Sequence, residues 1–283
     1  HHIASSYKEA IAIAINAGID INMVPYNQVF MDLLIQLVQE GRIKESRINQ
    51  SVHRIIKLKY QMGLFDVPFR NPKDYKDFGS QEFSKTALKC AQESMILLKN
   101  NESILPLKRN SKILVVGPTA NSMNALNGGW TYSWQGYNSD IIAQNENTIY
   151  DAVKKKNGSE NTFYIQGSDF EKTTNIDSAI ARAQSVDYII LCLGEDAYAE
   201  TPGFVDDITL SEAQLSLAQA LNKTGKPIVL LLSEGRPRLF NNIEPFAKAI
   251  ILSFLPGNQG GNAFSDVLFG DYNPSGKLPI TYP

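Results

Sequence analysis

Four short apolar runs, separated by helical patterns, constrain the fold of this chain more than any other feature. They read ILVV, YIILCL, IVLLL and AIILSF, and they predict strands at 112–116, 188–193, 228–233 and 249–254. Strands that are apolar at nearly every position are typical of parallel sheets covered on both faces. Helical patterns precede, separate or follow these strands at 84–99, 176–184, 211–222 and 261–269. The sequence therefore predicts an α/β fold, with a doubly wound, mostly parallel sheet sandwiched by helices.

The first 66 residues follow a different pattern. They predict helices at 7–16, 30–39 and 45–62 and one short strand at 19–24 (IDINMV), where apolar and polar residues alternate. A proline-containing, mixed-charge stretch comes next. We interpret residues 67–80 as a linker between two domains, because irregular segments of this composition mark domain boundaries.

Charge and composition exclude several classes of protein. The chain has 27 Lys and Arg against 29 Asp and Glu, a net charge of −2, so no nucleic-acid partner is expected. The apolar runs are too short for a membrane-spanning helix, so no membrane partner is expected either. Cys90 and Cys192 lie in apolar segments and are expected to be buried free thiols. The chain starts without Met or a signal peptide, which suggests that it begins inside a larger polypeptide.

Polar and small residues gather where the predicted strands end. They are Gly117-Pro118 and the segments 194–200, 234–237 and 255–257. Open parallel sheets bind ligands at this carboxyl edge. The turn after the first of these strands has no glycine-rich nucleotide motif, and His1, His2 and His53 all precede the second domain. We therefore expect neither a cofactor nor a metal, and no Ser-His-Asp triad.

Five acids lie within 13 positions of one loop of the second domain. They are Glu195, Asp196, Glu200, Asp206 and Asp207. Carboxyl groups among aromatic side chains at a strand end suit glycosidic bond cleavage, which needs one protonated acid and one carboxylate. A solvated acidic loop is the alternative interpretation.

A glycine-rich loop, GGWTYSWQG, holds both tryptophans of the chain, Trp130 and Trp134. Exposing a tryptophan is costly, so each either packs beneath the loop or stacks on a ligand. Sugar rings stack well on indole faces. The loop is therefore a candidate sugar-binding element.

Together these motifs resemble glycoside hydrolase family 3, the β-glucosidase and exo-β-glucanase family. The resemblance spans nearly the whole chain and rests on segments in a fixed order, including HHIASSYKEAIAIAINAGIDINMVP, RINQSVHRIIKLKYQMGLFD, ESMILLKNNESILPL, GGWTYSWQG, LGEDAYAETPG, SEGRPR and LPGNQGGNAFSDVLFGDYNPSGKLPITYP. It implies that residues 1–66 are the C-terminal end of a truncated (β/α)8-like barrel and that residues 81–283 form the α/β sandwich domain. The family's nucleophile is an Asp in a Ser-Asp-Trp motif, which does not occur in this sequence.

The resemblance also implies roles for the acids. In GEDAYAE, Glu200 takes the place of the family's acid/base residue, and Glu195 is the fallback, although its position directly after a strand suits a structural acid. Many relatives have Gly-Asp soon after this loop, whereas this chain has Gly203-Phe204-Val205 before Asp206. No role is transferred to Asp206 or Asp207.

Three aromatic residues are expected to serve substrate binding. By resemblance, Trp134 flanks the acceptor-side sugar, while Trp130 is expected to pack beneath its loop. Tyr198 lies in the acid-bearing segment itself. Arg236 resembles a structural arginine near the domain interface.

The implied activity is retaining hydrolysis of terminal non-reducing β-D-glucosyl residues from oligosaccharides or β-glucosides. The missing upstream barrel segment would supply the nucleophile, so the chain alone is expected to be inactive. Two alternatives stay open: a stand-alone carbohydrate-binding or interaction module, and a β-xylosidase-type member of the family. An N-acetylglucosaminidase is less favoured, because it would leave Glu200 without a role. A periplasmic or secreted location is favoured over a cytoplasmic one.

Overall fold

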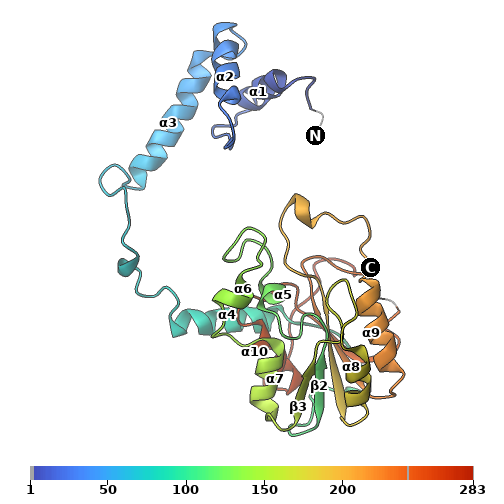
Figure 1. The fold of residues 1–283 in the computed structure, drawn as a ribbon. Helices are drawn as coiled ribbons and strands as arrows, with labels where there is room; N and C mark the ends of the chain where they lie inside the picture. Colours follow the sequence, from blue (N-terminus) through green and yellow to red (C-terminus); the bar gives the residue numbers. More distant parts are fainter. Residues whose placement is uncertain (1–2, 241, 283) are drawn as a thin grey trace. The chain divides into compact units, whose positions relative to one another are not determined.

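The computed structural model of the protein describes residues 3–240 and 242–282, which form two compact units with a boundary between Lys76 and Asp77 (Figure 1). Each unit has its own hydrophobic core. Within the described ranges, every helix is too short or too polar to span a bilayer.

The first unit consists of three helices, α1 (Tyr7–Asn16), α2 (Val29–Gln39) and α3 (Glu45–Gln61), followed by a short 3₁₀ helix, η1 (Pro72–Asp74). Their small core contains Ile11, Ile15, Leu37 and Ile43. Ser6 caps α1 by accepting a hydrogen bond from the Glu9 amide at 3.2 Å. All three helices were predicted to within one or two residues at each end.

The strand predicted at 19–24 is wrong. This segment makes no strand pairing among the described residues, and the side chains of Ile21 and Met23 are exposed. A β-strand is stabilised by hydrogen bonds to a neighbouring strand, and the described part of this unit contains none. Alternation of apolar and polar residues predicts the side-chain pattern of a strand but cannot supply its partner.

The second unit contains a six-stranded sheet with the order β1-β6-β5-β4-β2-β3. The strands are β1 (Ile96–Asn100), β2 (Ile113–Val116), β3 (Thr162–Ile165), β4 (Tyr188–Gly194), β5 (Ile228–Ser233) and β6 (Ala247–Leu252). Only β1 is antiparallel to its neighbour among these strands. At the centre, Ile189 of β4 pairs with Leu114 of β2 and with Ile228 of β5. The predicted doubly wound, mostly parallel α/β fold is confirmed.

Helices cover both faces of the sheet (Figure 1). On one face, α4 (Gln81–Ser94), α7 (Ile149–Asn157) and α10 (Gly260–Leu268) pack on the core around Ile190 and Leu231. On the other, α8 (Ile176–Ala183) and α9 (Glu212–Asn222) pack around Leu191 and Leu230. The short helices α5 (Met123–Asn127), α6 (Ser139–Ile142), η2 (Asn101–Ser103) and η3 (Thr201–Gly203) lie in connections.

Three details differ from the sequence predictions. The helix expected over 84–99 ends at Ser94, and the chain then forms β1, an edge strand. The other edge strand, β3, was not predicted. Cys192 is buried in the sheet, where burial raises the pKa of its thiol, but Cys90 is exposed on α4. The expectation that both thiols are buried was therefore wrong for Cys90.

Candidate functional site

Two loops are bonded to each other at the carboxyl edge of the sheet. The acid loop, residues 195–203, follows β4, and the tryptophan loop, residues 128–136, follows α5. The side-chain amide of Gln135 joins them: its Nε2 donates to the Ala199 carbonyl at 3.1 Å, and its Oε1 accepts from the Ala199 amide at 3.0 Å. The two motifs selected from the sequence therefore form one surface.

Glycine makes this close approach of the loops possible. A Cβ atom on Gly129 would lie 2.2 Å from the Tyr198 carbonyl oxygen, which is backbone and cannot move aside. A Cβ on Gly136 would lie 2.2 Å from the Gly128 carbonyl oxygen and 3.0 Å from the Ala197 side chain. Packing between the loops thus requires Gly129, while Gly136 is required by packing within its own loop as well as against the acid loop.

Glu195 is buried and fully engaged in hydrogen bonds. Only 7% of the residue is exposed. Its Oε2 accepts from the amides of Gly235 and Arg236 at 3.0 and 3.2 Å, and its Oε1 accepts from Arg236 Nε at 2.7 Å and Arg238 Nη1 at 3.1 Å. Two arginine side chains and two backbone amides therefore occupy this carboxylate, which leaves it little room to contact a ligand. In this geometry Glu195 joins the ends of β4 and β5.

Glu200, by contrast, is exposed, and its carboxyl group has no hydrogen-bond partner among the described residues. Its backbone lies in the left-handed region at φ +56°, where residues other than glycine are uncommon. The Glu200 carbonyl accepts from the Gly203 amide at 2.9 Å and thereby begins η3. The side chain is therefore free to contact a ligand.

Tyr198 packs under the acid loop. The Arg236 guanidinium lies 4.0 Å from the centre of its ring, and a Cβ on Gly203 or Gly235 would strike that ring or its hydroxyl. Burial, followed by the charge of Glu195, raises the pKa of the phenol. Arg236 Nη1 also donates to the Gly203 carbonyl at 2.7 Å, so this arginine holds the acid loop from below.

The two tryptophans are both substantially exposed, Trp130 by 69% and Trp134 by 48%. The expectation that Trp130 packs beneath its loop is wrong for this structure. The space beneath the loop is occupied by the acid loop, against which Gly129 and Gly136 pack. The Trp130 amide donates to the Trp134 carbonyl at 2.9 Å, which closes the loop between the two indoles.

The remaining predicted acids are in different environments. Asp207 accepts from the Thr209 amide at 2.7 Å, which lowers the pKa of its carboxyl, and Asp206 is exposed. Burial raises the pKa of Asp196, and the nearby charge of Asp140 adds to this effect. The five acids are thus close in the sequence but do not form one site.

Glu234 belongs to a strand-end segment that the sequence pointed to, but the buried cluster that it forms beside Glu195 was not predicted. Glu234, at the end of β5, is completely buried, and burial raises its pKa to about 7. Its carboxylate accepts from the hydroxyl of Tyr282 and from the Arg238 amide. Arg238 in turn donates to the Thr209 carbonyl at 2.7 Å. An acid directly after an apolar strand was the available signal, but Tyr282 lies 48 positions away in the sequence.

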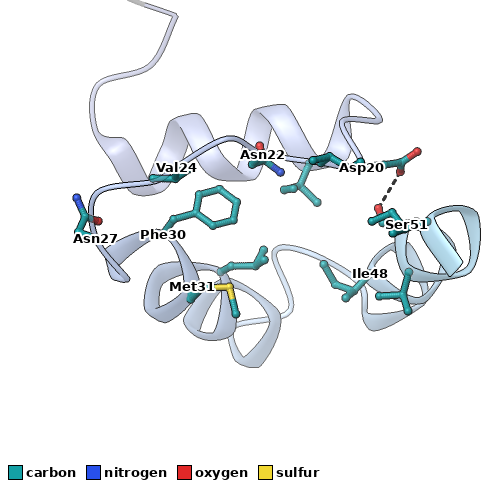
Figure 2. Close-up of a pocket in the computed structure, with 13 residues that line it drawn as sticks. Asp20, Asn22, Val24, Asn27, Phe30, Met31, Ile48 and Ser51 are labelled. Atoms are coloured by element: carbon teal, nitrogen blue, oxygen red, sulfur yellow. Dashed lines mark hydrogen bonds between the residues drawn. The ribbon is translucent and has the colours of Figure 1, made fainter. Parts of the chain in front are cut away.

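The first unit has a separate hollow of about 380 Å³ (Figure 2). Its lining is mostly apolar and includes Phe30, Met31 and Ile48. At its polar end, Asp20 accepts from the Ser51 hydroxyl at 2.8 Å and from Arg47 at 3.0 Å. These bonds lower the pKa of Asp20 and leave its carboxylate occupied by protein donors. The hollow adjoins the core of the unit, and Asp20 is the one acid among the described residues that line it.

Comparison with known proteins agrees with the fold and with the order of the motifs. The model of the glycosyl hydrolase family 3 C-terminal domain matches residues 95–283, and that of the family's N-terminal domain matches residues 1–58. A lysosomal beta glucosidase of Dictyostelium discoideum is 39% identical, over 100% of this chain and 36% of its own length. A periplasmic beta-glucosidase of Salmonella typhimurium is 32% identical, over 100% of this chain and 40% of its own length. A beta-xylosidase of Formosa agariphila is 30% identical, over 100% of this chain and 40% of its own length.

Solved structures give the same result. A beta-glucosidase from Listeria innocua, in complex with isofagomine, superposes with a TM-score of 0.85 at 29% identity, covering 100% of this chain and 39% of that one. The chain spans about two fifths of the length of these relatives. Since the C-terminal domain model alone matches more than half of the sequence, the chain belongs to glycosyl hydrolase family 3, a family of glycoside hydrolases.

Proposed function

We propose that this chain is part of a retaining β-glycosidase that removes terminal non-reducing β-D-glucosyl residues, with Glu200 as its acid/base residue. The observation that carries the proposal is the contrast between the two glutamates of GEDAYAE. Glu195 is buried under four donors, whereas the Glu200 carboxyl is exposed and unpartnered among the described residues. A general acid must reach the substrate, and of these two glutamates only Glu200 has an exposed carboxyl.

The chemistry needs two carboxyl groups. The protonated Glu200 would donate its proton to the glycosidic oxygen as the bond to the anomeric carbon breaks, while a second carboxylate attacks that carbon. Glu200, now ionised, would then take a proton from the water that releases the sugar. The second carboxylate is the Asp of the family's Ser-Asp-Trp motif, which residues 1–283 do not contain. The two carboxyls should lie about 5–5.5 Å apart in the complete site.

The exposed aromatic residues support the same proposal. Trp134 is half-exposed and directly precedes Gln135. The Gln135 side chain is hydrogen-bonded to Ala199, the residue before Glu200. We assign Trp134 to the acceptor-side sugar, and Trp130 offers a second exposed indole for stacking. Tyr198 would serve the site indirectly, because its packed ring supports the acid loop rather than facing solvent.

The names of the relatives bear on the substrate and the location. Two are beta-glucosidases, described as lysosomal and periplasmic, which favours a terminal glucosyl substrate and a periplasmic or secreted enzyme. A beta-xylosidase is 30% identical over the whole chain, so a β-xyloside is the second candidate substrate. A stand-alone carbohydrate-binding module is less favoured, because the relatives that match the whole chain have the names of glycosidases.

The test is turnover of an aryl β-glucoside and an aryl β-xyloside by the native polypeptide that contains residues 1–283. Glu200→Gln should reduce turnover by about 10²–10⁴-fold, the usual contribution of a general acid/base. Asp206→Asn, which changes an exposed acid six positions further on, is the matched control and should leave turnover unchanged. The 283-residue chain alone should be inactive, because it lacks the nucleophile. Turnover by the chain alone, or equal losses in both variants, would contradict the proposal.

A further inference from the structure

Gln135 makes a two-point contact with one residue of the acid loop. Both polar atoms of its side-chain amide are used, and both bond to the backbone of Ala199. The two hydrogen bonds resemble those that a residue of a neighbouring β-strand makes to the amide and carbonyl of its partner. A bidentate contact fixes the orientation of the Ala199 peptide groups as well as their position.

The position of this contact in the sequence is informative. Ala199 directly precedes Glu200, and Gln135 directly follows Trp134. One side chain therefore joins the backbone beside the proposed acid/base to the backbone beside the proposed sugar-stacking tryptophan. The Ala199 side chain is itself buried, so this point of the acid loop is held from two sides.

Glu200 needs such support because of its backbone. Left-handed backbone at a residue other than glycine costs free energy, and it persists only where the surroundings impose it. On its C-terminal side, the Gly203 amide bonds to the Glu200 carbonyl at 2.9 Å. On its N-terminal side, Gln135 holds Ala199. With φ at +56°, the direction of the Glu200 side chain depends on both restraints.

We infer that Gln135 is a positioning residue that aims the Glu200 carboxyl at the glycosidic oxygen, an inference that rests on the proposed function of Glu200. Gln135 does not touch the reacting atoms in this assignment. It acts through Ala199, whose peptide groups set the backbone conformation of the next residue. Loss of the contact should therefore weaken general-acid catalysis without removing the acid.

The first experiment varies the leaving group. A substrate that releases an acidic phenol, such as dinitrophenol, needs little protonation of its leaving oxygen. A substrate that releases an alcohol needs a well-placed general acid. In the native polypeptide, Gln135→Ala should lower kcat/KM by about 10–100-fold for alkyl β-glucosides, the cost of misplacing a catalytic group by about 1 Å. For the dinitrophenyl glucoside the loss should stay below about 3-fold. Gln144→Ala, an exposed glutamine without a side-chain hydrogen bond in the described structure, is the matched control.

A second variant gives a pH signature. In Gln135→Glu, the ionised carboxylate can accept from the Ala199 amide but cannot donate to its carbonyl, whereas the protonated acid can do both. Alkyl-glucoside activity of this variant, relative to wild type, should therefore recover as the pH falls through the pKa of the new carboxyl. A residue that only stabilised the fold would produce neither the leaving-group dependence nor this relative pH profile.

Glu200→Gln, measured on the same substrates, separates the two ideas. If it shows the leaving-group dependence and Gln135→Ala does not, the role of Gln135 is wrong and that of Glu200 stands. If Glu200→Gln lacks the dependence, the proposed function itself fails.

Hydrogen exchange on the 283-residue chain tests the contact without any measurement of activity. Gln135→Ala should speed exchange of the Ala199 amide at least about 10-fold at an unchanged thermal midpoint, and unchanged exchange would overturn the inference.

Discussion

Replacing Glu195 by glutamine should destabilise the second unit, although the two side chains have nearly the same shape. Four donors now share the Glu195 carboxylate: the amides of Gly235 and Arg236 and the guanidinium groups of Arg236 and Arg238. In the variant, the NH₂ group of the glutamine would face some of these donors and could not accept from them. Removing one partner of a buried ion pair costs about 3–5 kcal/mol. The arginine side chains keep 27% and 13% exposure, so water offsets part of the loss and we expect about 3 kcal/mol.

The matched variant is Glu200→Gln, which changes an acid five positions away on the same loop. Its side chain is exposed and has no hydrogen-bond partner among the described residues, so its effect on stability should stay within about 0.5 kcal/mol. Thermal unfolding of the 283-residue chain, followed by circular dichroism at pH 7, measures both variants. A loss of about 3 kcal/mol lowers the midpoint of a domain of about 200 residues by roughly 6–12 °C.

The result that would refute this reasoning is specific. If Glu195→Gln melts within about 2 °C of wild type, the four donors do not depend on the charge of Glu195 and its structural role is wrong. If Glu200→Gln is destabilised as strongly as Glu195→Gln, the Glu200 carboxyl is engaged in the fold and is not free for catalysis. The expected pattern is a stability loss at Glu195 alone and, in the native polypeptide, the larger activity loss at Glu200.

Three other predictions concern the buried acid and the two loops. Burial raises the pKa of Glu234 from 4.5 to about 7, so the folded state keeps a proton that the unfolded state has lost. Stability should therefore fall by about 3 kcal/mol as the pH rises from about 4.5 to 7, and urea unfolding should show a flatter pH dependence in Glu234→Gln; parallel curves would contradict this. Gly129→Ala places a Cβ 2.2 Å from the Tyr198 carbonyl oxygen, so it should cost about 1–3 kcal/mol in the same denaturation assay, and a neutral effect would show that the loops can separate freely. Trp134→Ala should weaken binding of a β-linked glucose disaccharide to the native polypeptide about 10-fold at an unchanged thermal midpoint, as measured by calorimetry; unaltered affinity would remove Trp134 from the site.

The central strands were predictable because their burial is visible in the sequence. β2, β4, β5 and β6 are buried on both faces, so their residues are apolar at nearly every position. The edge strands carry a weaker signal. β1 and β3 each have one neighbouring strand and are only partly buried, and their mixed apolar and polar segments resemble a helix end or a loop. The prediction of a strand at 19–24 was wrong because its apolar and polar alternation resembles a strand, but no partner strand lies beside it among the described residues.

The candidate site was predictable in its composition but not in its division of roles. The sequence places Glu195 and Glu200 on one strand-end loop and both tryptophans on another, and the family resemblance favours Glu200. Sequence spacing could not show that Trp130 is exposed. The space beneath its loop is filled by another loop more than 60 positions further along the chain.

By itself, the sequence determined the parallel sheet, the edge at which the loops meet and the family to which the chain belongs, because hydrophobic burial and ordered motifs are encoded locally along the chain. Only the tertiary structure decided which acid is occupied and which is free. Glu195 meets Arg236 and Arg238 only because β4 and β5 end side by side, which brings together residues some 40 positions apart. The accessibility and the hydrogen-bond partners of a carboxyl depend on such neighbours, and a linear sequence pattern does not contain them.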